Sequence, residues 1–164
     1  MNAAEFDALF LAQYPRVRRL VARVVRDPGR AEELASDTLM KLWRDPAGRA
    51  GNVEAWLRRV AVRSAIDELR RRDRRDRFSR WLGLGSAPPD PGALHDGART
   101  REQVRAVLAR MEPRQSELLL LRSEGLSYKE IAEAAGIHPA SVGTLLARAQ
   151  QTFRKEYVAR YGER

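Results

Sequence analysis

The sequence predicts an all-α protein in which two small helical domains are joined by a flexible linker. Apolar residues recur every three or four positions over most of the 164 residues, and no stretch shows the strict alternation typical of a strand. Between residues 81 and 98 the chain is rich in glycine and proline, which cannot hold a long helix and indicate a linker of roughly twenty residues. We therefore expect domains at residues 1–80 and 99–164.

Apolar stripes predict the first two helices of the N-terminal domain. The first stripe covers residues 6–24, and Pro15 within it is expected to kink or split the helix. The second stripe covers residues 31–43. It is expected to end at the Asp-Pro-Ala-Gly turn of residues 45–48.

A third helix is predicted to start at Asn52, which can cap it, and to continue into the arginine-rich residues 70–80. Trp56 falls on its apolar stripe, which favours a core position over an exposed stacking surface. Residues 58–80 hold ten arginines against four acidic residues, so they carry +6 of the chain's net +9. Such a concentration of charge favours a polyanionic partner: nucleic acid, an acidic protein surface or anionic lipid.

Two short helices joined by a tight turn are predicted near the C-terminus. Ser127 and Glu130 have the spacing of a capping box at the start of the first. Gly136 can supply a left-handed turn, and Pro139 suits the first turn of the second helix because its missing N–H would be unpaired there. This is the layout of a helix-turn-helix, although a generic helical hairpin packed for stability would show part of it.

Composition and motifs disfavour several other classes of protein. There are no cysteines, which excludes disulfides and thiolate metal sites and fits a cytoplasmic protein. No apolar run predicts a membrane-spanning helix, and the N-terminus lacks the pattern of a signal peptide. The two histidines, His95 and His138, do not suggest a site by their spacing. With no phosphate-binding loop, metal cluster or nucleophile–base pair, we expect no catalytic residues, metal or cofactor.

Taken together, these segments resemble an extracytoplasmic-function (ECF) sigma factor, the smallest type of sigma-70 family initiation factor. The segments AEELASDTLMKLWR (31–44) and VEAWLRRVAVRSAIDELRRRDRR (53–75) are similar to the family's N-terminal sigma domain, region 2. The segment from residue 105 to 154, which contains GLSYKEIAEAAGIHPASVGTLLARA, is similar to its C-terminal domain, region 4, a winged-helix-like helix-turn-helix. The resemblance covers nearly the whole chain except the linker.

The resemblance implies three binding surfaces, for core RNA polymerase and for two elements of promoter DNA. The polymerase would be bound by the second helix, through Glu33, Asp37, Lys41, Leu42 and Trp43. The −10 element would be bound and melted by the third helix, through Asn52, Trp56, Arg58, Arg59, Arg63 and Arg70. The −35 element would be bound by the helix-turn-helix and its flank, through Arg122, Lys129, His138, Ser141, Thr144 and Arg148.

The predicted recognition helix departs from the family pattern. Members commonly carry a basic residue at the position of Gly143 and often another at that of Leu145, and both charges are absent here. Arg148 remains. The missing cations reduce the phosphate contribution to affinity and leave more to hydrogen bonding and DNA shape.

Other functions stay open at this point. A free-standing helix-turn-helix repressor or activator would need only the second domain, and would leave the first unexplained. A polymerase-binding adaptor without promoter recognition would fit the weakly charged recognition helix. Many members of the family are held inactive by an anti-sigma factor, and the linker would permit such a partner. The resemblance also implies that the linker passes near the RNA exit path.

Overall fold

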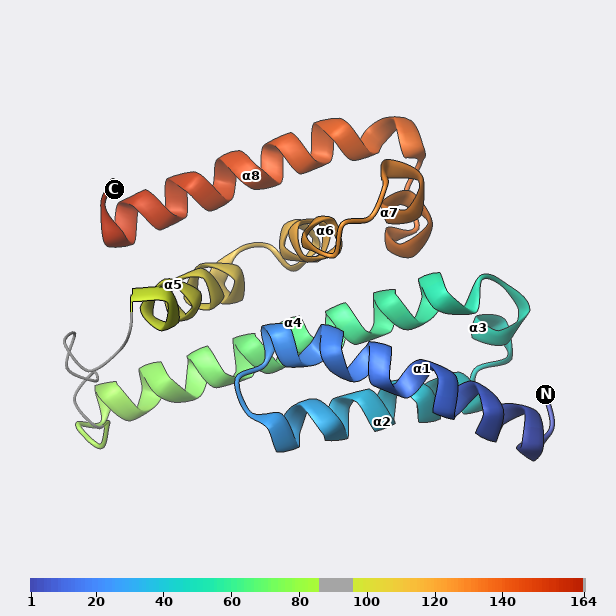
Figure 1. Cartoon of the computed structure of the whole chain (residues 1–164). Helices are drawn as coiled ribbons and strands as arrows, with labels where there is room; N and C mark the ends of the chain where they lie inside the picture. Colours follow the sequence, from blue (N-terminus) through green and yellow to red (C-terminus); the bar gives the residue numbers. More distant parts are fainter. Residues whose placement is uncertain (86–95, 164) are drawn as a thin grey trace.

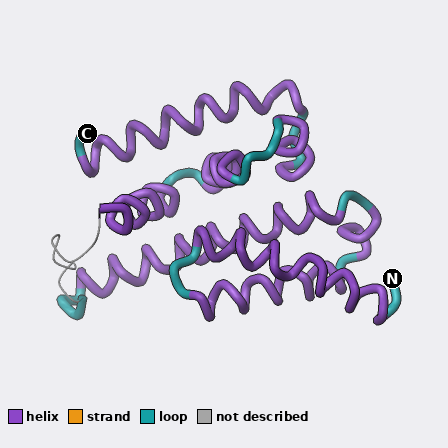
Figure 2. The backbone as a smooth tube through the Cα atoms, in the orientation of Figure 1, coloured by secondary structure: helices purple, strands orange, loops and turns teal. Residues whose placement is uncertain are grey.

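The computed structural model describes residues 1–85 and 96–163, and helices account for nearly all of them (Figures 1 and 2). The N-terminal half holds α1 (Ala3–Val24), α2 (Pro28–Arg44), α3 (Pro46–Ala50) and α4 (Val53–Trp81). The C-terminal half holds α5 (Asp96–Arg110), α6 (Pro113–Ser123), α7 (Tyr128–Ala135) and α8 (Pro139–Tyr161). No strand occurs in these two described stretches, so the predicted all-α class is confirmed. Most of the predicted linker, including His95, lies outside them.

Helices α1, α2 and α4 pack on one another and bury the predicted apolar stripes (Figure 1). Val21, Leu39 and Ala61 meet in this core with no exposed surface. Pro15 does not split the first helix, since α1 continues through it from Ala3 to Val24. The predicted turn at residues 45–48 is in fact the start of α3, because Asp45 ends α2 and its carboxylate caps the next helix by accepting from the amide of Ala47.

The C-terminal half contains the predicted helix-turn-helix. The amide of Glu130 donates to the Ser127 hydroxyl at 3.2 Å, and the Ser127 amide donates to the Glu130 carboxylate at 2.8 Å, which completes the capping box. Hydrogen bonds to the Glu130 carboxylate, first from the Ser127 amide and second from the Ser127 side chain, hold the pKa of Glu130 below its ordinary value. Gly136 ends α7 in the left-handed region with φ of 66°, and Pro139 opens α8. The local sequence signals therefore act as predicted.

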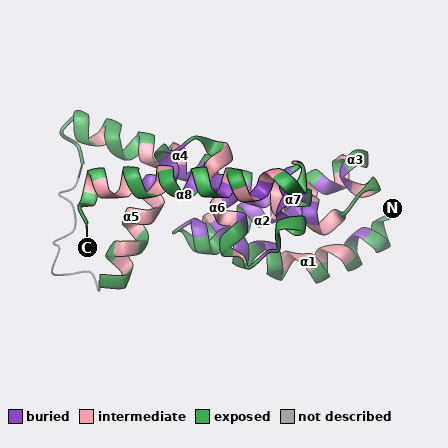
Figure 3. Ribbon diagram, turned by 90° about the horizontal axis from the view of Figure 1, so that it is seen from above, coloured by how far each residue is buried: buried purple, intermediate pink, exposed green. Residues whose placement is uncertain are grey.

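The two halves pack directly against each other. α4 lies between them, with α1 and α2 on one side and α5, α6 and α7 on the other (Figure 1). The last turns of α4 extend beyond α1 and α2, and their surface is mostly exposed (Figure 3). The division into domains at 1–80 and 99–164 stays a prediction.

Candidate nucleic-acid and polymerase interface

The solvent-facing side of α2 offers charged groups to a partner. Glu33, Asp37 and Lys41 are exposed and follow one another at four-residue spacing, so they share one face. Glu33 already pairs with Arg30 at 2.7 Å. Within the described residues, Asp37 and Lys41 have no ion-pair partner, which leaves both charges available. The hydrogen bond that Arg30 makes to Glu33, and after that the one to Glu68, raises the pKa of Arg30 above its ordinary value.

The two apolar residues predicted for the same surface are placed differently. Leu42 has no exposed area. The prediction that it contacts a partner is therefore wrong for as long as α2 stays packed in the core. The reason is its position on the buried stripe with Leu39. Trp43 is partly buried, and its ring packs against Phe6 at a centroid distance of 4.8 Å.

The start of α4 is built by Asn52 and Trp56. The Asn52 side chain caps the helix by accepting a hydrogen bond from the amide of Ala55 at 3.0 Å. Trp56 is partly buried, and its indole lies so close to Gly48 of α3 that a Cβ added there would come within 2.6 Å of the ring. Trp56 therefore has the packing role that its apolar stripe favours, and Gly48 is required by this close approach.

Three of the four arginines predicted to bind DNA reach instead across to the C-terminal half. Arg59 donates to the carbonyl oxygens of Ala134 and, at 2.9 Å, Glu133, at the C-terminus of α7. Arg70 donates at 3.0 Å to the carbonyl of Met111, just beyond α5. The last carbonyls of a helix lack intrahelical partners and lie at the negative end of its dipole, so an arginine there is doubly favoured.

The other two arginines make ion pairs. Arg63 binds the carboxylate of Glu117 at 3.2 Å, and this carboxylate is almost fully buried in α6. Arg58 stays within its own helix, 3.5 Å from Glu54. The direction of Arg59, Arg63 and Arg70 could not be read from the sequence, because it depends on where the second half of the chain packs.

The C-terminal half reaches back in the same way. Arg105 of α5 donates at 2.9 Å to the carbonyl of Val24, at the end of α1. Burial lowers the pKa of Arg105 from its ordinary value. Arg23 pairs with Glu124 at 2.8 Å, and Arg110 with Asp73 at 3.1 Å. Arginines from both halves thus hold this interface together.

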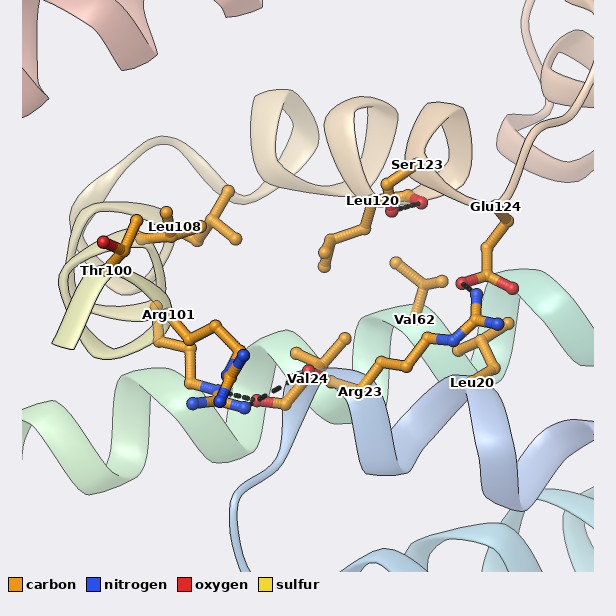
Figure 4. Close-up of a pocket in the computed structure, with 12 residues that line it drawn as sticks. Leu20, Arg23, Val24, Val62, Thr100, Arg101, Leu108, Leu120, Ser123 and Glu124 are labelled. Carbon is orange, nitrogen blue, oxygen red and sulfur yellow. Dashed lines mark hydrogen bonds and ion pairs between the residues drawn. The ribbon is translucent and has the colours of Figure 1, made fainter. Parts of the chain in front are cut away.

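An apolar cavity of about 190 Å³ lies inside this ring of polar contacts (Figure 4). Val62 of α4, Leu108 of α5 and Leu120 of α6 line it in Figure 4. Arg23 and Arg105 line it as well. Side chains around a void lose part of their dispersion contacts. The interface therefore relies on its polar rim more than a fully packed domain core would.

The predicted recognition helix α8 exposes its first turns. Thr144 and Arg148 are exposed, and Ser141 is half-buried. His138 caps the helix, with its Nδ1 accepting a hydrogen bond from the amide of Ala140 at 3.1 Å. This leaves Nε2 as the ring nitrogen that can donate outward. Leu145 packs against the core, so a charged side chain at its position would have to point in another direction.

Tyr128 is a candidate contact that sequence reasoning missed. It is half exposed, and the guanidinium of Arg122 lies 5.7 Å from its ring centre in a cation–π contact. A Cβ added at Gly143 would lie 3.4 Å from the same ring. In the sequence, the signal for this contact was a tyrosine directly after the capping Ser127. The position that lacks the family's basic residue is therefore bordered by an aromatic ring and a cation from outside the recognition helix.

Within the parts of the chain that the structure covers, no group of histidine and acidic residues could hold a metal ion. No helix in those parts is both long and apolar enough to cross a bilayer. The site is therefore described by its charges, hydroxyls and aromatic rings.

The fold and these surfaces define a helical transcription factor with a helix-turn-helix and a second, arginine-rich helical unit. Residues 9–75 match the family described as sigma-70 region 2, and residues 101–152 match sigma-70 region 4. The chain belongs to the sigma-70 family, in its ECF group. It is an alternative sigma factor, which binds core RNA polymerase and directs transcription initiation at promoters.

Individual relatives agree with this assignment. The ECF sigma factor SigK of Mycolicibacterium vanbaalenii is 29% identical, over 94% of this chain and 82% of its own. The sigma factor CarQ of Myxococcus xanthus is 29% identical, over 92% and 86%. Among solved structures, the sigma factor RpoE of Bartonella quintana, in complex with the anti-sigma factor NepR, matches 93% of this chain and 96% of its own with a TM-score of 0.52. At 22% identity that match supports the fold alone.

The contacts that the α4 arginines make between the two halves predict how the chain responds to their removal. Replacing Arg59, Arg63 and Arg70 together by alanine should weaken the closed packing, since each loses hydrogen bonds worth roughly 1 kcal/mol. Fluorophores on Glu32→Cys and Gln151→Cys would report the distance between the halves, as the chain has no other cysteine. The variant should populate longer distances.

A matched control removes the same charge from the outer side of α4. Arg71, Arg74 and Arg75 lie on the exposed side of that helix. Their joint replacement by alanine should leave the distance distribution unchanged. Equal lengthening in both triple variants would show that net charge, rather than these contacts, holds the halves together.

Proposed function

We propose that three surfaces of this chain divide the work of promoter recognition. The charged face of α2 binds core polymerase, α4 binds and opens the −10 element, and α7–α8 bind the −35 element. One observation carries the proposal most strongly. The arginine-rich helix and the exposed helix-turn-helix belong to the two separately matched regions of one chain, so both promoter contacts are available to a single factor.

The −10 contact requires the halves of the chain to separate. Arg59 and Arg70 are partly buried against the C-terminal half, and Arg63 is paired with Glu117, so the closed form already occupies the donors that phosphates would need. Arginine can exchange a carbonyl or carboxylate for a phosphate because its planar group donates to each of them in similar geometry. The cavity inside the interface reduces the packing that is lost on opening. We infer that polymerase binding holds the open form.

The −35 contact is the weaker of the two. Ser141, Thr144 and the outward nitrogen of His138 supply hydrogen bonds, and Arg148 supplies one cation at the outer face. The exposed Arg122 and Lys129 border the helix and are placed for backbone phosphates. Because polymerase joins both contacts in one complex, neither has to bind tightly alone.

Further features of the function follow as inferences from family membership. We infer that the protein works in the cytoplasm, where polymerase acts, and that it is a binding factor without a catalytic site of its own. The Bartonella relative was solved with an anti-sigma factor. A regulator of that kind would suit this chain by competing for the faces that the two halves present to each other.

Promoter-dependent transcription tests the proposal. Core polymerase with this protein should initiate at specific sites on native promoter fragments, and core alone should not. Arg148→Ala should lower promoter occupancy about tenfold without changing affinity for core, as one good side-chain contact is worth about 1–3 kcal/mol. The double variant Asp37→Arg, Lys41→Glu should instead reduce holoenzyme formation, measured by co-migration with core.

Each outcome of that experiment separates the alternatives. Tight promoter binding without polymerase would favour a free-standing regulator. Binding to core without initiation would favour an adaptor. If Arg148→Ala weakened core binding and promoter binding equally, the assignment of that residue to DNA would be wrong.

Restoring the missing charge on α8 gives a second prediction. Gly143→Lys should tighten holoenzyme binding to the promoter and steepen the salt dependence of log Kd by about one unit, because one more phosphate is neutralised. The Tyr128 ring leaves ordinary contact distance for the new Cβ. Gly143→Gln serves as the uncharged control of similar size. An unchanged salt slope in Gly143→Lys would place this helix away from the DNA backbone.

A further inference from the structure

The outer face of the last turns of α4 carries two large aromatic side chains that the fold leaves uncovered. Phe78 is 60% exposed and Trp81 is 80% exposed. Their rings stack on each other, with centroids 6.1 Å apart and planes 28° apart. The adjoining Leu82 is exposed as well. Exposed aromatic rings gathered at one place on a soluble protein commonly mark a binding surface.

Arginines precede the two rings on the same side of the helix. Arg71, Arg74 and Arg75 are exposed and lie one to two turns before Phe78, on the stripe that three- and four-residue spacing defines. Arg74 has no ionic partner among the residues that the structure describes. Arg71 and Arg75 lie 3.5 Å and 3.6 Å from the single carboxylate of Glu68, so their combined charge exceeds what it neutralises.

This outer face is separate from the interface between the halves. On the opposite side of the same turns, Asp73 pairs with Arg110 of α5 at 3.1 Å, and Arg72 lies 4.0 Å from Glu102 of α5. The outer face is therefore available even when the halves are closed. Phe78 and Trp81 also lie outside both matched family regions, which cover residues 9–75 and 101–152.

The chemistry of this face fits single-stranded nucleic acid. Such ligands are bound by aromatic rings that stack on bases and by cations that follow the phosphates, without need for a particular sequence. From Arg71 to Trp81 the helix rises about 15 Å, which gives room for phosphates and for adjoining bases. A lipid surface would call for an apolar stripe along the helix, whereas here the apolar groups are confined to its end and arginines occupy the preceding turns.

We propose that Phe78 and Trp81 form a stacking platform for unpaired bases of the melted promoter, and that Arg71, Arg74 and Arg75 hold the neighbouring phosphates. The biological setting rests on the proposed function, in which the preceding part of α4 opens the −10 element. The unpaired strand then has a second attachment on the same helix. Melted DNA is held because its exposed bases exchange water for aromatic faces, which paired bases cannot do.

Binding of a short oligonucleotide to the full-length protein tests the platform without polymerase, since the face is exposed in the closed form. The probe is fluorescein-labelled dT12, and the comparison ligand is a duplex of equal length at the same salt concentration. Wild-type protein should prefer dT12. The variant Phe78→Ala, Trp81→Ala should bind dT12 about tenfold more weakly, with its duplex affinity unchanged. Leu11→Ala, which removes a 76% exposed side chain from α1, is the control and should change neither.

Tryptophan fluorescence adds a readout specific to stacking. Trp81 is far more exposed than Trp43 and Trp56, so dT12 should quench mainly its emission. Trp81→Phe should keep most of the affinity and lose most of the quenching. Unchanged dT12 binding in the double alanine variant, or equal losses for single strand and duplex, would overturn the proposal.

Two further results would also overturn it. If the double variant lost affinity for core polymerase but not for dT12, the rings would be a protein contact. If wild-type protein bound phosphatidylserine vesicles more tightly than dT12, and the double variant lost that binding, the rings would be a lipid contact. Failure of promoter-specific transcription by wild-type protein concerns the proposed function alone, and the oligonucleotide result would stand independently.

Discussion

The arrangement of this protein depends on one interaction: arginines of α4 bind the exposed ends of helices in the opposite half. Arg59 and Arg70 bind carbonyl oxygens at the ends of α7 and α5, and Arg105 returns the same contact to the end of α1. Each guanidinium donates to carbonyl oxygens that the helix leaves unpaired, and so takes the place of the water that would otherwise bind them. Around an apolar cavity, these contacts help to hold a closed form through groups that also bind phosphate.

This arrangement explains why a recognition helix with so little charge can belong to a DNA-binding factor. Most of the excess positive charge lies on α4 rather than on α8. Within the closed form, Arg59, Arg63 and Arg70 of α4 are bound to the protein itself. When the halves separate, these arginines exchange acceptors within the protein for DNA phosphates. The interface between the halves and the promoter therefore compete for the same side chains. The helix-turn-helix then contributes position through Ser141, Thr144 and Arg148, while α4 contributes most of the electrostatic attraction.

Local features of this chain could be predicted from its sequence because they depend on neighbours within one turn. The capping box at Ser127, the left-handed Gly136 and the cap at Asn52 are of this kind. Pro15 was harder, since tertiary packing can hold a helix through a proline. The direction of Arg59 and the burial of Leu42 depend on helices far away in sequence, so the family resemblance assigned the first to DNA and the second to a partner surface without showing where either side chain points.

A reversible cross-link between the halves tests most directly whether the closed form and promoter binding exclude each other. Asp73→Cys and Arg110→Cys place two unique thiols where an ion pair joins the two halves, and a reducible bifunctional reagent would hold them together. With core polymerase, the cross-linked protein should give no promoter-specific transcript, and reduction should restore it. Undiminished transcription by the cross-linked protein would contradict the account.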